Sequence, residues 1–447
     1  MMFSIRKFIK QNLSKKLPRF RNIFRSGQVE RLLKKTISFA SKQSRNRLLR
    51  VRGFTLIELL VAMLIATLII STLLAFVISI IDVDRREQAK VESQGEVQAA
   101  LDYIADDMQE AVYVYNADGM TRLTTATAAN PIAIPPVVAA PAQLPVFADS
   151  TPILAFWKRI YYAPDEPLNV LGGIEKLTGC LEFDTPANCG TPPKGGGRYV
   201  YALVVYYLIY DNSTGANTTW SNAARIGRWE IRDGIRSTCQ NIDPSTCPAP
   251  RPTSRVVMNA SSSINYWTPP DPGFKLFDSE GSNKESIMNS WTKAVANYDT
   301  SNTPKDKILL DFIDDTPYTS LQDDGTAGNS LVDIVIAPNL PAVSGVTPNN
   351  PVFGRSCSNP SIGVGGSSTQ RVPPAFQTAS TNKAENLSSF YVCVNSTEVV
   401  ARIFMRGNAL ARLRPNQTES QRNITNTTST FLTTGNVRAF GRGKLFF

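Results

Sequence analysis

Hydrophobic residues form one long uninterrupted block near the start of the chain, at 54–81. The block holds a single charged residue, Glu58, and contains neither Gly nor Pro. A run of more than about 18 such residues predicts a membrane-spanning helix. A carboxylate within such a helix is costly in hydrocarbon, so Glu58 is expected to need a partner of opposite charge.

After this block the pattern becomes amphipathic. Apolar residues recur at three- and four-residue spacing, whereas the acidic residues lie largely on other faces; the apolar positions are Val97, Leu101, Ile104, Met108 and Ala111 or Val112. This period predicts that the helix continues to about residue 115, with a candidate bend at Gly95. A helix this long exceeds the bilayer core, so its second half, residues 82–115, is expected to pack on a folded domain.

The rest of the chain predicts a β-rich head. Residues 116–150 are rich in Ala, Pro and Thr and predict a linker, because proline is not tolerated in a helix interior. Beyond them, runs of β-branched and aromatic residues between Gly-, Pro- and Asn-rich connections indicate strands at 153–162, 198–210, 225–232, 308–313, 331–337, 389–394 and 399–405. We therefore predict an α+β fold, with an antiparallel sheet in a head over 151–415 packed on the amphipathic half of the first helix. Residues 416–447 are expected to be a polar tail.

Charge divides the chain into two parts. Residues 1–53 contain 16 Lys and Arg and one acidic residue, so this leader carries +15, whereas the remainder carries −5. The folded part is therefore mildly acidic, which argues against nucleic acid as a partner. Dense positive charge before an apolar span predicts a cytoplasmic N-terminus and a head on the other side of the inner (plasma) membrane. We favour a cytoplasmic tail that is removed, and the alternative is a basic amphipathic segment on membrane lipid.

Cysteine and histidine content restrict the chemistry further. The chain has no His, which excludes Ser-His-Asp triads and His metal sites. All six cysteines follow residue 179, and the sequence neighbours are Cys180/Cys189, Cys239/Cys247 and Cys357/Cys393. An even number in a part predicted to face outward favours disulfides, and neighbour pairing is the simplest of the connectivities. Zinc binding is the alternative, but these spacings are wide for a zinc knuckle.

The residues from Gly53 to Glu58, followed by the apolar run, resemble the N-terminal signature of type IV prepilins and type II secretion pseudopilins. The resemblance implies that a prepilin peptidase cuts after Gly53 and methylates the new N-terminal Phe54, and that Glu58 supports assembly. The leader is longer than in many members of that family. Residues 98–113 are similar to minor pilins of the W/J type. Residues 84–90 resemble pseudopilins of the hormogonium polysaccharide secretion system of filamentous cyanobacteria, which implies polysaccharide secretion and gliding motility.

The resemblance gives Glu58 a specific partner. Cleavage creates a free α-amino group on Phe54, and this group on a neighbouring subunit can pair with Glu58 between packed helices. Assembly is therefore expected to require cleavage of the leader first. The expected partners are prepilin peptidase, other pilins or pseudopilins, an inner-membrane assembly platform and membrane lipid, and the expected location is the membrane and then a filament. We expect no cofactor and no enzymatic activity.

Two further features remain open. Some pseudopilins bind calcium, and five aspartates lie close in sequence, at Asp311, Asp314, Asp315, Asp323 and Asp324; their pattern does not match an EF-hand, and a solvated acidic loop is the preferred interpretation. The basic C-terminal segment 438–444 either contacts an acidic polysaccharide or a filament neighbour, or is a frayed end, which we favour. The alternative function for the whole chain is a membrane-anchored binding or enzymatic module that does not join a filament.

Overall fold

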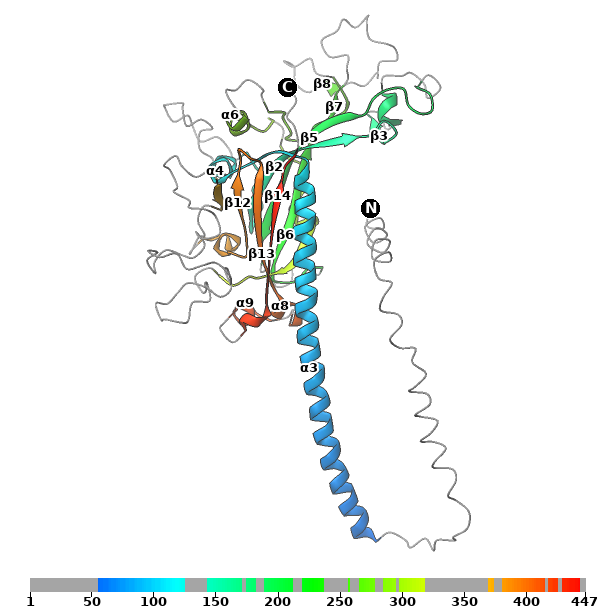
Figure 1. The fold of residues 1–447 in the computed structure, drawn as a ribbon, viewed down its shortest axis with the longest axis vertical. Helices are drawn as coiled ribbons and strands as arrows, with labels where there is room; N and C mark the ends of the chain where they lie inside the picture. The colour runs from blue at the N-terminus through cyan, green and yellow to red at the C-terminus, as the bar shows by residue number, and fades with distance from the viewer. Residues whose placement is uncertain are drawn as a thin grey trace, which may run out of the picture. The chain divides into compact units, whose positions relative to one another are not determined.

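The computed structural model describes residues 55–124, 143–170, 174–181, 189–211, 219–236, 256–257, 265–277, 284–294, 297–317, 369–373, 380–414, 417–424 and 428–442. The chain divides into two compact units, Met1–Val77 and Ile78–Phe447, and the boundary falls inside the helix α3 (Leu56–Gln109). The first unit, as far as it is described, consists of the apolar start of α3. The second contains the rest of α3 and the head (Figure 1).

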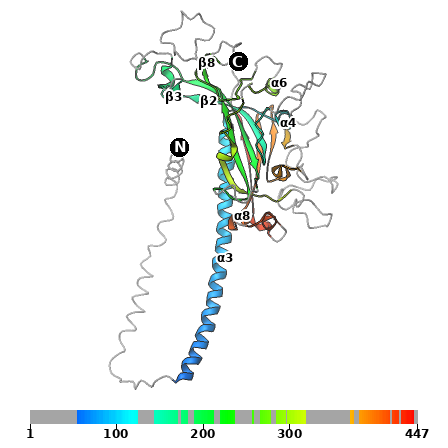
Figure 2. The same ribbon diagram turned by 180° about the vertical axis from the view of Figure 1, so that it is seen from behind.

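The head is built on one large antiparallel sheet. Its nine strands are β1 (Ala111–Val114), β2 (Ser150–Tyr162), β5 (Arg198–Ile209), β6 (Ala224–Arg232), β10 (Ile308–Ile313), β11 (Thr369–Val372), β12 (Phe390–Asn395), β13 (Val400–Asn408) and β14 (Leu432–Phe440). The order is β1-β2-β5-β6-β10-β13-β12-β11, and β14 pairs with β13 along its whole length. The helix α3 and this sheet confirm the predicted α+β fold (Figure 2).

Smaller elements surround the sheet. The short strands are β3 (Pro167–Val170), β4 (Ile174–Leu177), β7 (Ile235–Arg236), β8 (Val256–Val257) and β9 (Asn265–Thr268). The short helices are α4 (Ala117–Thr124), α6 (Lys284–Asn289), α8 (Ala409–Leu413) and α9 (Glu419–Arg422), with 3-10 turns η1 (Thr178–Cys180), η2 (Pro304–Asp306), η5 (Lys383–Asn386) and η6 (Ser429–Phe431). A minor core of Leu181, Val200, Ile235 and Trp267 lies between some of these elements and β5.

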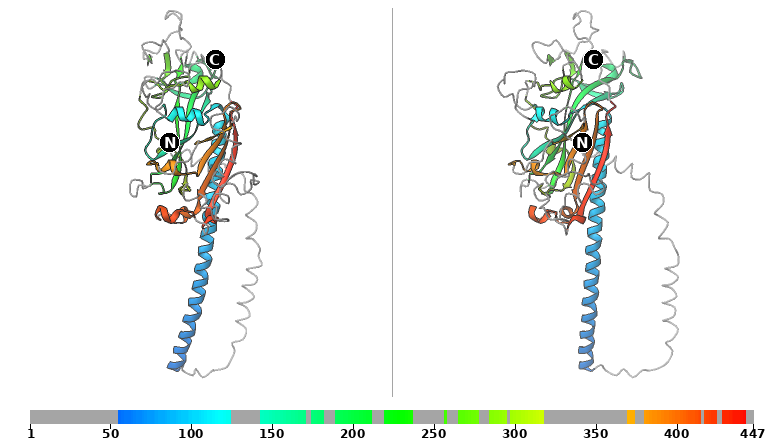
Figure 3. Two further views of the ribbon diagram at one scale, coloured as in Figure 1. Left: turned by 90° about the vertical axis from the view of Figure 1, so that its left-hand side faces the viewer. Right: turned by 60° about the vertical axis from the view of Figure 1, so that its left-hand side comes forward.

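The amphipathic half of α3 packs on the sheet as predicted. Its buried residues recur at helical spacing: Ala89, Ser93, Val97, Ala100, Leu101, Ile104 and Met108. Two views show α3 running alongside β14 (Figure 3), and the hydroxyls of Ser93 and Thr433 lie 2.7 Å apart where these elements meet. Gly435 makes the close approach possible, because a Cβ there would lie 2.7 Å from a methyl group of Leu101.

The structure corrects several predicted boundaries. The helix ends at Gln109 and not near 115, because residues 111–114 form β1 and pair with β2. The helix runs without a break through Gly95. The predicted linker contains the helix α4, whereas its Pro-rich part falls outside the described residues. The predicted strand at 331–337 also lies outside them.

The largest correction concerns the C-terminal part of the chain. Residues 416–447 were expected to be a polar tail with a frayed end, but Leu432–Phe440 form β14 and pair with nine consecutive residues of β13. Thr433 of β14 meets Ser93 of α3, and Gly435 lies against Leu101, which explains why a strand with Gly, Asn and Thr is retained there. Arg438 therefore belongs to a strand, while residues 443–447 are outside the described part of the chain.

Candidate functional site

The first site is the start of α3. Thr55 precedes the helix, and its Oγ1 accepts a hydrogen bond of 3.3 Å from the backbone N–H of Glu58. A Thr followed three residues later by Glu is an N-terminal capping pattern, which explains why the helix begins at Leu56. Glu58 lies in the first turn of the helix and is exposed. Gly53 and Phe54 lie just outside the described residues.

The helix surface around Glu58 is apolar and uncovered. Every residue from Thr55 to Val77 is exposed, including Leu56 at 85% and Leu68 at 65%. Among the described helices, only α3 is long and apolar enough to cross a membrane. Burying this many apolar side chains is strongly favourable, so this surface requires lipid or other helices around it.

A buried charge network holds the opposite end of α3 on the sheet. Asp107 is almost fully buried and accepts hydrogen bonds from Lys158 Nζ at 2.7 Å and Arg228 Nε at 2.9 Å. Tyr206 Oη also donates to it, at 2.7 Å. Burial raises the pKa of the Asp107 carboxyl, but the hydrogen bonds and positive charges of Arg228 and Lys158 outweigh this effect, so the pKa lies below its ordinary value. The network fixes the position of α3 on β2, β5 and β6.

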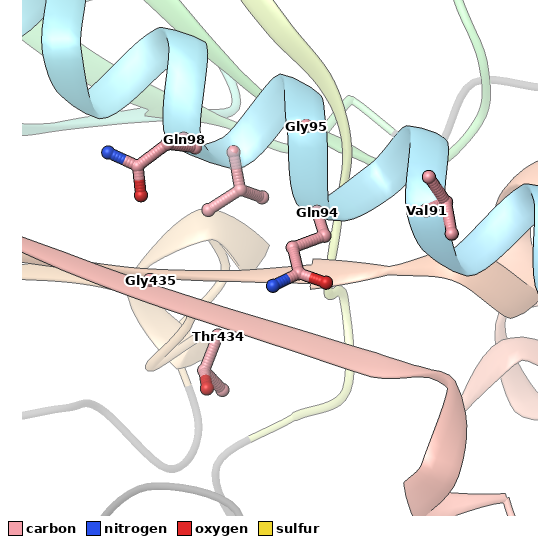
Figure 4. Close-up of a pocket in the computed structure, with 7 residues that line it drawn as sticks. Val91, Gln94, Gly95, Gln98, Thr434 and Gly435 are labelled. Carbon is pink, nitrogen blue, oxygen red and sulfur yellow. The ribbon is translucent and has the colours of Figure 1, made fainter. Parts of the chain in front are cut away.

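A groove of about 310 Å³ lies between α3 and β14 (Figure 4). Its lining comes from two segments, with Val91, Gln94, Gly95, Val97 and Gln98 on α3 and Thr434 and Gly435 on β14. Gln94 reaches from α3 toward β14, whereas Thr434 points away from the helix (Figure 4). A Cβ added to Gly95 would meet no atom within 4 Å. Close packing inside the head therefore does not require a glycine at this position, and its missing side chain leaves space on this side of the helix.

The aspartates that were weak calcium candidates serve other purposes. Asp314 forms an ion pair of 2.7 Å with Arg406, and Asp315 accepts a hydrogen bond of 3.0 Å from Arg422 Nε. Both carboxylates are fully buried, so the preferred interpretation of a solvated loop was wrong for these two residues. Burial raises the pKa of Asp315 to about 6, although Arg422 opposes the shift.

The remaining candidates of that acidic segment do not complete a metal site. Asp311 accepts hydrogen bonds from the backbone N–H and the hydroxyl of Ser221. Asp323 and Asp324 lie outside the described residues. Within the described ranges, no group of three or more acidic or Cys side chains is arranged to hold a metal ion.

Neighbour pairing of cysteines is confirmed for the first pair. Cys180 and Cys189 form a disulfide with a Cα–Cα distance of 5.3 Å. Cys393 is also disulfide-bonded. The other three, Cys239, Cys247 and Cys357, fall outside the described residues, so the pairing predicted for them is not tested.

Sequence reasoning missed the residues that join α3 to the sheet. Asp107 precedes the buried Met108 and follows Ile104 by three positions, which places it at the edge of the apolar stripe. An acidic residue at that position is a signal of a buried ion pair. Gly95 was singled out from the sequence as a candidate bend, but its place in the wall of the groove was not predicted.

The comparison with protein families agrees with the start of the chain. Residues 48–74 match the family model of the prokaryotic N-terminal methylation motif, and the matched stretch includes Gly53, Phe54 and Glu58. This motif indicates processing and assembly of the type IV pilin or pseudopilin kind, and so implies a prepilin peptidase and other pilins as partners. With the motif at its start, the apolar helix anchors the protein in a membrane. Comparisons with curated proteins and with solved structures found no match.

Proposed function

We propose that this protein is a structural, non-enzymatic minor pseudopilin that joins a type IV pilus-like or type II secretion-like filament after cleavage at Gly53 and N-methylation of Phe54. The observation that carries the proposal is the combination of the methylation motif with Glu58 in the first turn of an exposed apolar helix. A helix that serves only as an anchor needs no carboxylate in its apolar surface, because such a group is costly in hydrocarbon.

Glu58 has a defined role in this function. In a single helix surrounded by lipid its charge is uncompensated, whereas beside the Phe54 amine of a neighbouring subunit it forms an ion pair in a medium of low dielectric constant. That amine exists only after cleavage. Assembly is therefore coupled to processing through one pair of opposite charges.

The cargo of the filament is a finer part of the proposal. The resemblance of residues 84–90 to pseudopilins of a polysaccharide secretion system supports a role in polysaccharide export and gliding motility. Deleting the gene in its host is expected to reduce exported polysaccharide while leaving the level of the peptidase unchanged. Unchanged export would contradict this part alone.

Mass spectrometry of the N-terminus tests the central claim. Protein purified from membranes is expected to begin with N-methylated Phe54. A Glu58→Ala variant is expected to be cleaved normally but to be lost from sheared filaments by at least about tenfold, because its helix has no partner for the Phe54 amine.

The matched control is Glu87→Ala, which removes an acid of the same helix that pairs with Lys90 at its surface. This control is expected to assemble like the wild type, because exposed ion pairs contribute little. Retention of residues 1–53 in the mature protein, or normal incorporation of Glu58→Ala, would refute the proposal.

A further inference from the structure

Two arginines lie directly opposite each other on β13 and β14. Arg402 and Arg438 are partners in the antiparallel register, and both side chains are exposed. Like charges at opposite positions of neighbouring strands repel each other. Their guanidinium groups each lie 4.9 Å from an aromatic ring centre, over Phe404 and Phe440. Neither arginine forms an ion pair with any residue that the structure describes. We call this pair the arginine face.

No carboxylate of these strands compensates the arginine face. The strands β11 to β14 contain four Arg and no Asp or Glu. One of the four, Arg406, is buried against Asp314, and Arg371 donates to the carbonyl oxygen of Pro373. The exposed charge of this part of the sheet is therefore positive, and its complement is an anionic surface.

The helix α3 has the opposite imbalance. Residues 91–110 contain six acidic residues and no Lys or Arg. Three are neutralised within the head, because Glu92 and Glu96 pair with Arg412 and Asp107 pairs with Lys158 and Arg228.

The other three form what we call the acidic stripe: Asp102, Asp106 and Glu110. All three are exposed and have no cationic partner in the described part of the chain. Asp102 and Asp106 lie four residues apart on one side of α3, a spacing at which like charges destabilise a helix, and Glu110 directly follows the last helical residue, Gln109.

The two charged surfaces lie on opposite sides of the layer that α3 and the sheet form. The residue of β14 that meets α3 is Gly435, whose added Cβ would touch Leu101 and Val97. Arg438 is three positions further along the strand, so it points to the other face. The arginine face lies on one side of this layer and the oppositely charged acidic residues lie on the other. This arrangement suits a head-to-tail contact between subunits, and contacts of that kind lead to open filaments.

We propose that the arginine face of one protomer docks on the acidic stripe of a second copy of this chain. The proposal rests on the proposed function, since it supplies a contact between heads in the filament. The spacing matches: Asp102 and Asp106 are about 6 Å apart along the axis of α3, and residues opposite each other on antiparallel strands are about 5 Å apart. Each arginine therefore faces one carboxylate, and the repulsion within both surfaces is relieved.

Zero-length carbodiimide crosslinking of the full-length protein in membranes tests the contact. This reagent joins carboxylates to amines, so the variant used is Arg402→Lys with Arg438→Lys, which keeps the charge and adds the amine. Crosslinked dimers are expected whose linked peptides join position 402 or 438 to position 102, 106 or 110. The same variant with Asp102→Asn, Asp106→Asn and Glu110→Gln is expected to lose them. Raising the ionic strength from about 0.05 M to about 0.5 M should reduce the yield, because exposed charges are screened.

Charge reversal provides the second arm. In cells that produce two differently tagged copies, Arg402→Glu with Arg438→Glu in both copies is expected to reduce mixed dimers by about tenfold or more. Mixed dimers should return when the second copy instead carries Asp102→Lys, Asp106→Lys and Glu110→Lys with its arginines intact. A variant that merely failed to fold would not be rescued in this way.

The outcomes separate this contact from the function on which it rests. N-methylated Phe54 and normal filaments without the expected crosslink would overturn the contact and leave the function standing. Linkage of the variant lysines to a different protein would also overturn it. An uncleaved leader in the wild type would overturn the proposed function itself.

Discussion

The two glycines that line the groove between α3 and β14 should respond in opposite ways to the addition of one methyl group. In the middle of a helix, glycine is about 0.5–1 kcal/mol less stable than alanine. A Cβ at Gly95 meets no atom within 4 Å, so no packing cost offsets this gain. Gly95→Ala is therefore expected to raise the free energy of unfolding of the head by about 0.5–1 kcal/mol.

Gly435→Ala is the matched comparison on the other wall of the groove. Its Cβ would lie 2.7 Å from Leu101 Cδ1 and 2.9 Å from Val97 Cγ1. Both neighbours are buried, and the β-branched Val97 has little rotamer freedom in a helix, so neither can move away easily. Overpacking of this kind costs about 1–3 kcal/mol, and β14 is expected to be loosened from α3.

Urea unfolding of the detergent-solubilised protein measures both effects. The fluorescence of the buried Trp157 and Trp229 reports on the head sheet, and the free energy follows from the midpoint and slope of the transition. A Gly95→Ala variant less stable than the wild type would show that this face of the helix is already filled. A neutral Gly435→Ala would show that β14 does not lie against Leu101.

Other changes test the ion pairs and the disulfide. Asp107→Asn leaves the buried Lys158 and Arg228 without a carboxylate and is expected to lower the free energy of unfolding in urea by about 3 kcal/mol. The control Asp106→Asn changes an exposed residue and should alter this free energy by less than about 0.5 kcal/mol. Because the pKa of Asp107 is lowered in the folded protein, the stability that it adds is present above about pH 4 and is lost as the pH falls through the folded pKa. A wild-type advantage over Asp107→Asn that does not decrease as the pH is lowered below about 4 would contradict this assignment. Replacing Cys180 and Cys189 by Ser opens a loop with a sequence separation of 9, and closing a loop of this length contributes about 3 kcal/mol to stability. Hydrogen exchange of β3 and β4 should therefore rise by up to about 100-fold, while that of β5 stays unchanged. Equal exchange rates in the wild type and the variant would show that the disulfide does not stabilise this region.

The sequence pattern correctly predicts those helices and strands that are specified by their own local periodicity and composition. The helix α3 and the strands β2, β5, β6, β10, β12 and β13 all fall where periodicity and β-branched composition placed them, within a few residues. The end of α3 was placed too late because residues 111–114 are apolar and fit either a helix or a strand. Pairing with β2 decides between the two, and that partner lies some 45 residues away in sequence.

The misjudged features all depend on distant partners. Asp314 and Asp315 look like part of an acidic loop, but the arginines that bury them are 92 and 107 residues further along the chain. The strand β14 has weak propensity of its own, and α3 and β13 hold it in place. The site at Glu58 is different, because a short motif specifies it and no long-range contact is required.

The position of β14 also fixes the order in which the head can mature. Ser93 and Thr433 meet across 340 residues of sequence, and the strand that covers Val97 and Leu101 is the last described strand to leave the ribosome. Until that moment the apolar stripe of the anchoring helix is partly bare, and ordering such distant segments is slow. During synthesis the subunit is therefore an incomplete head attached to a membrane helix, and β14 completes the head before the subunit can enter a larger assembly.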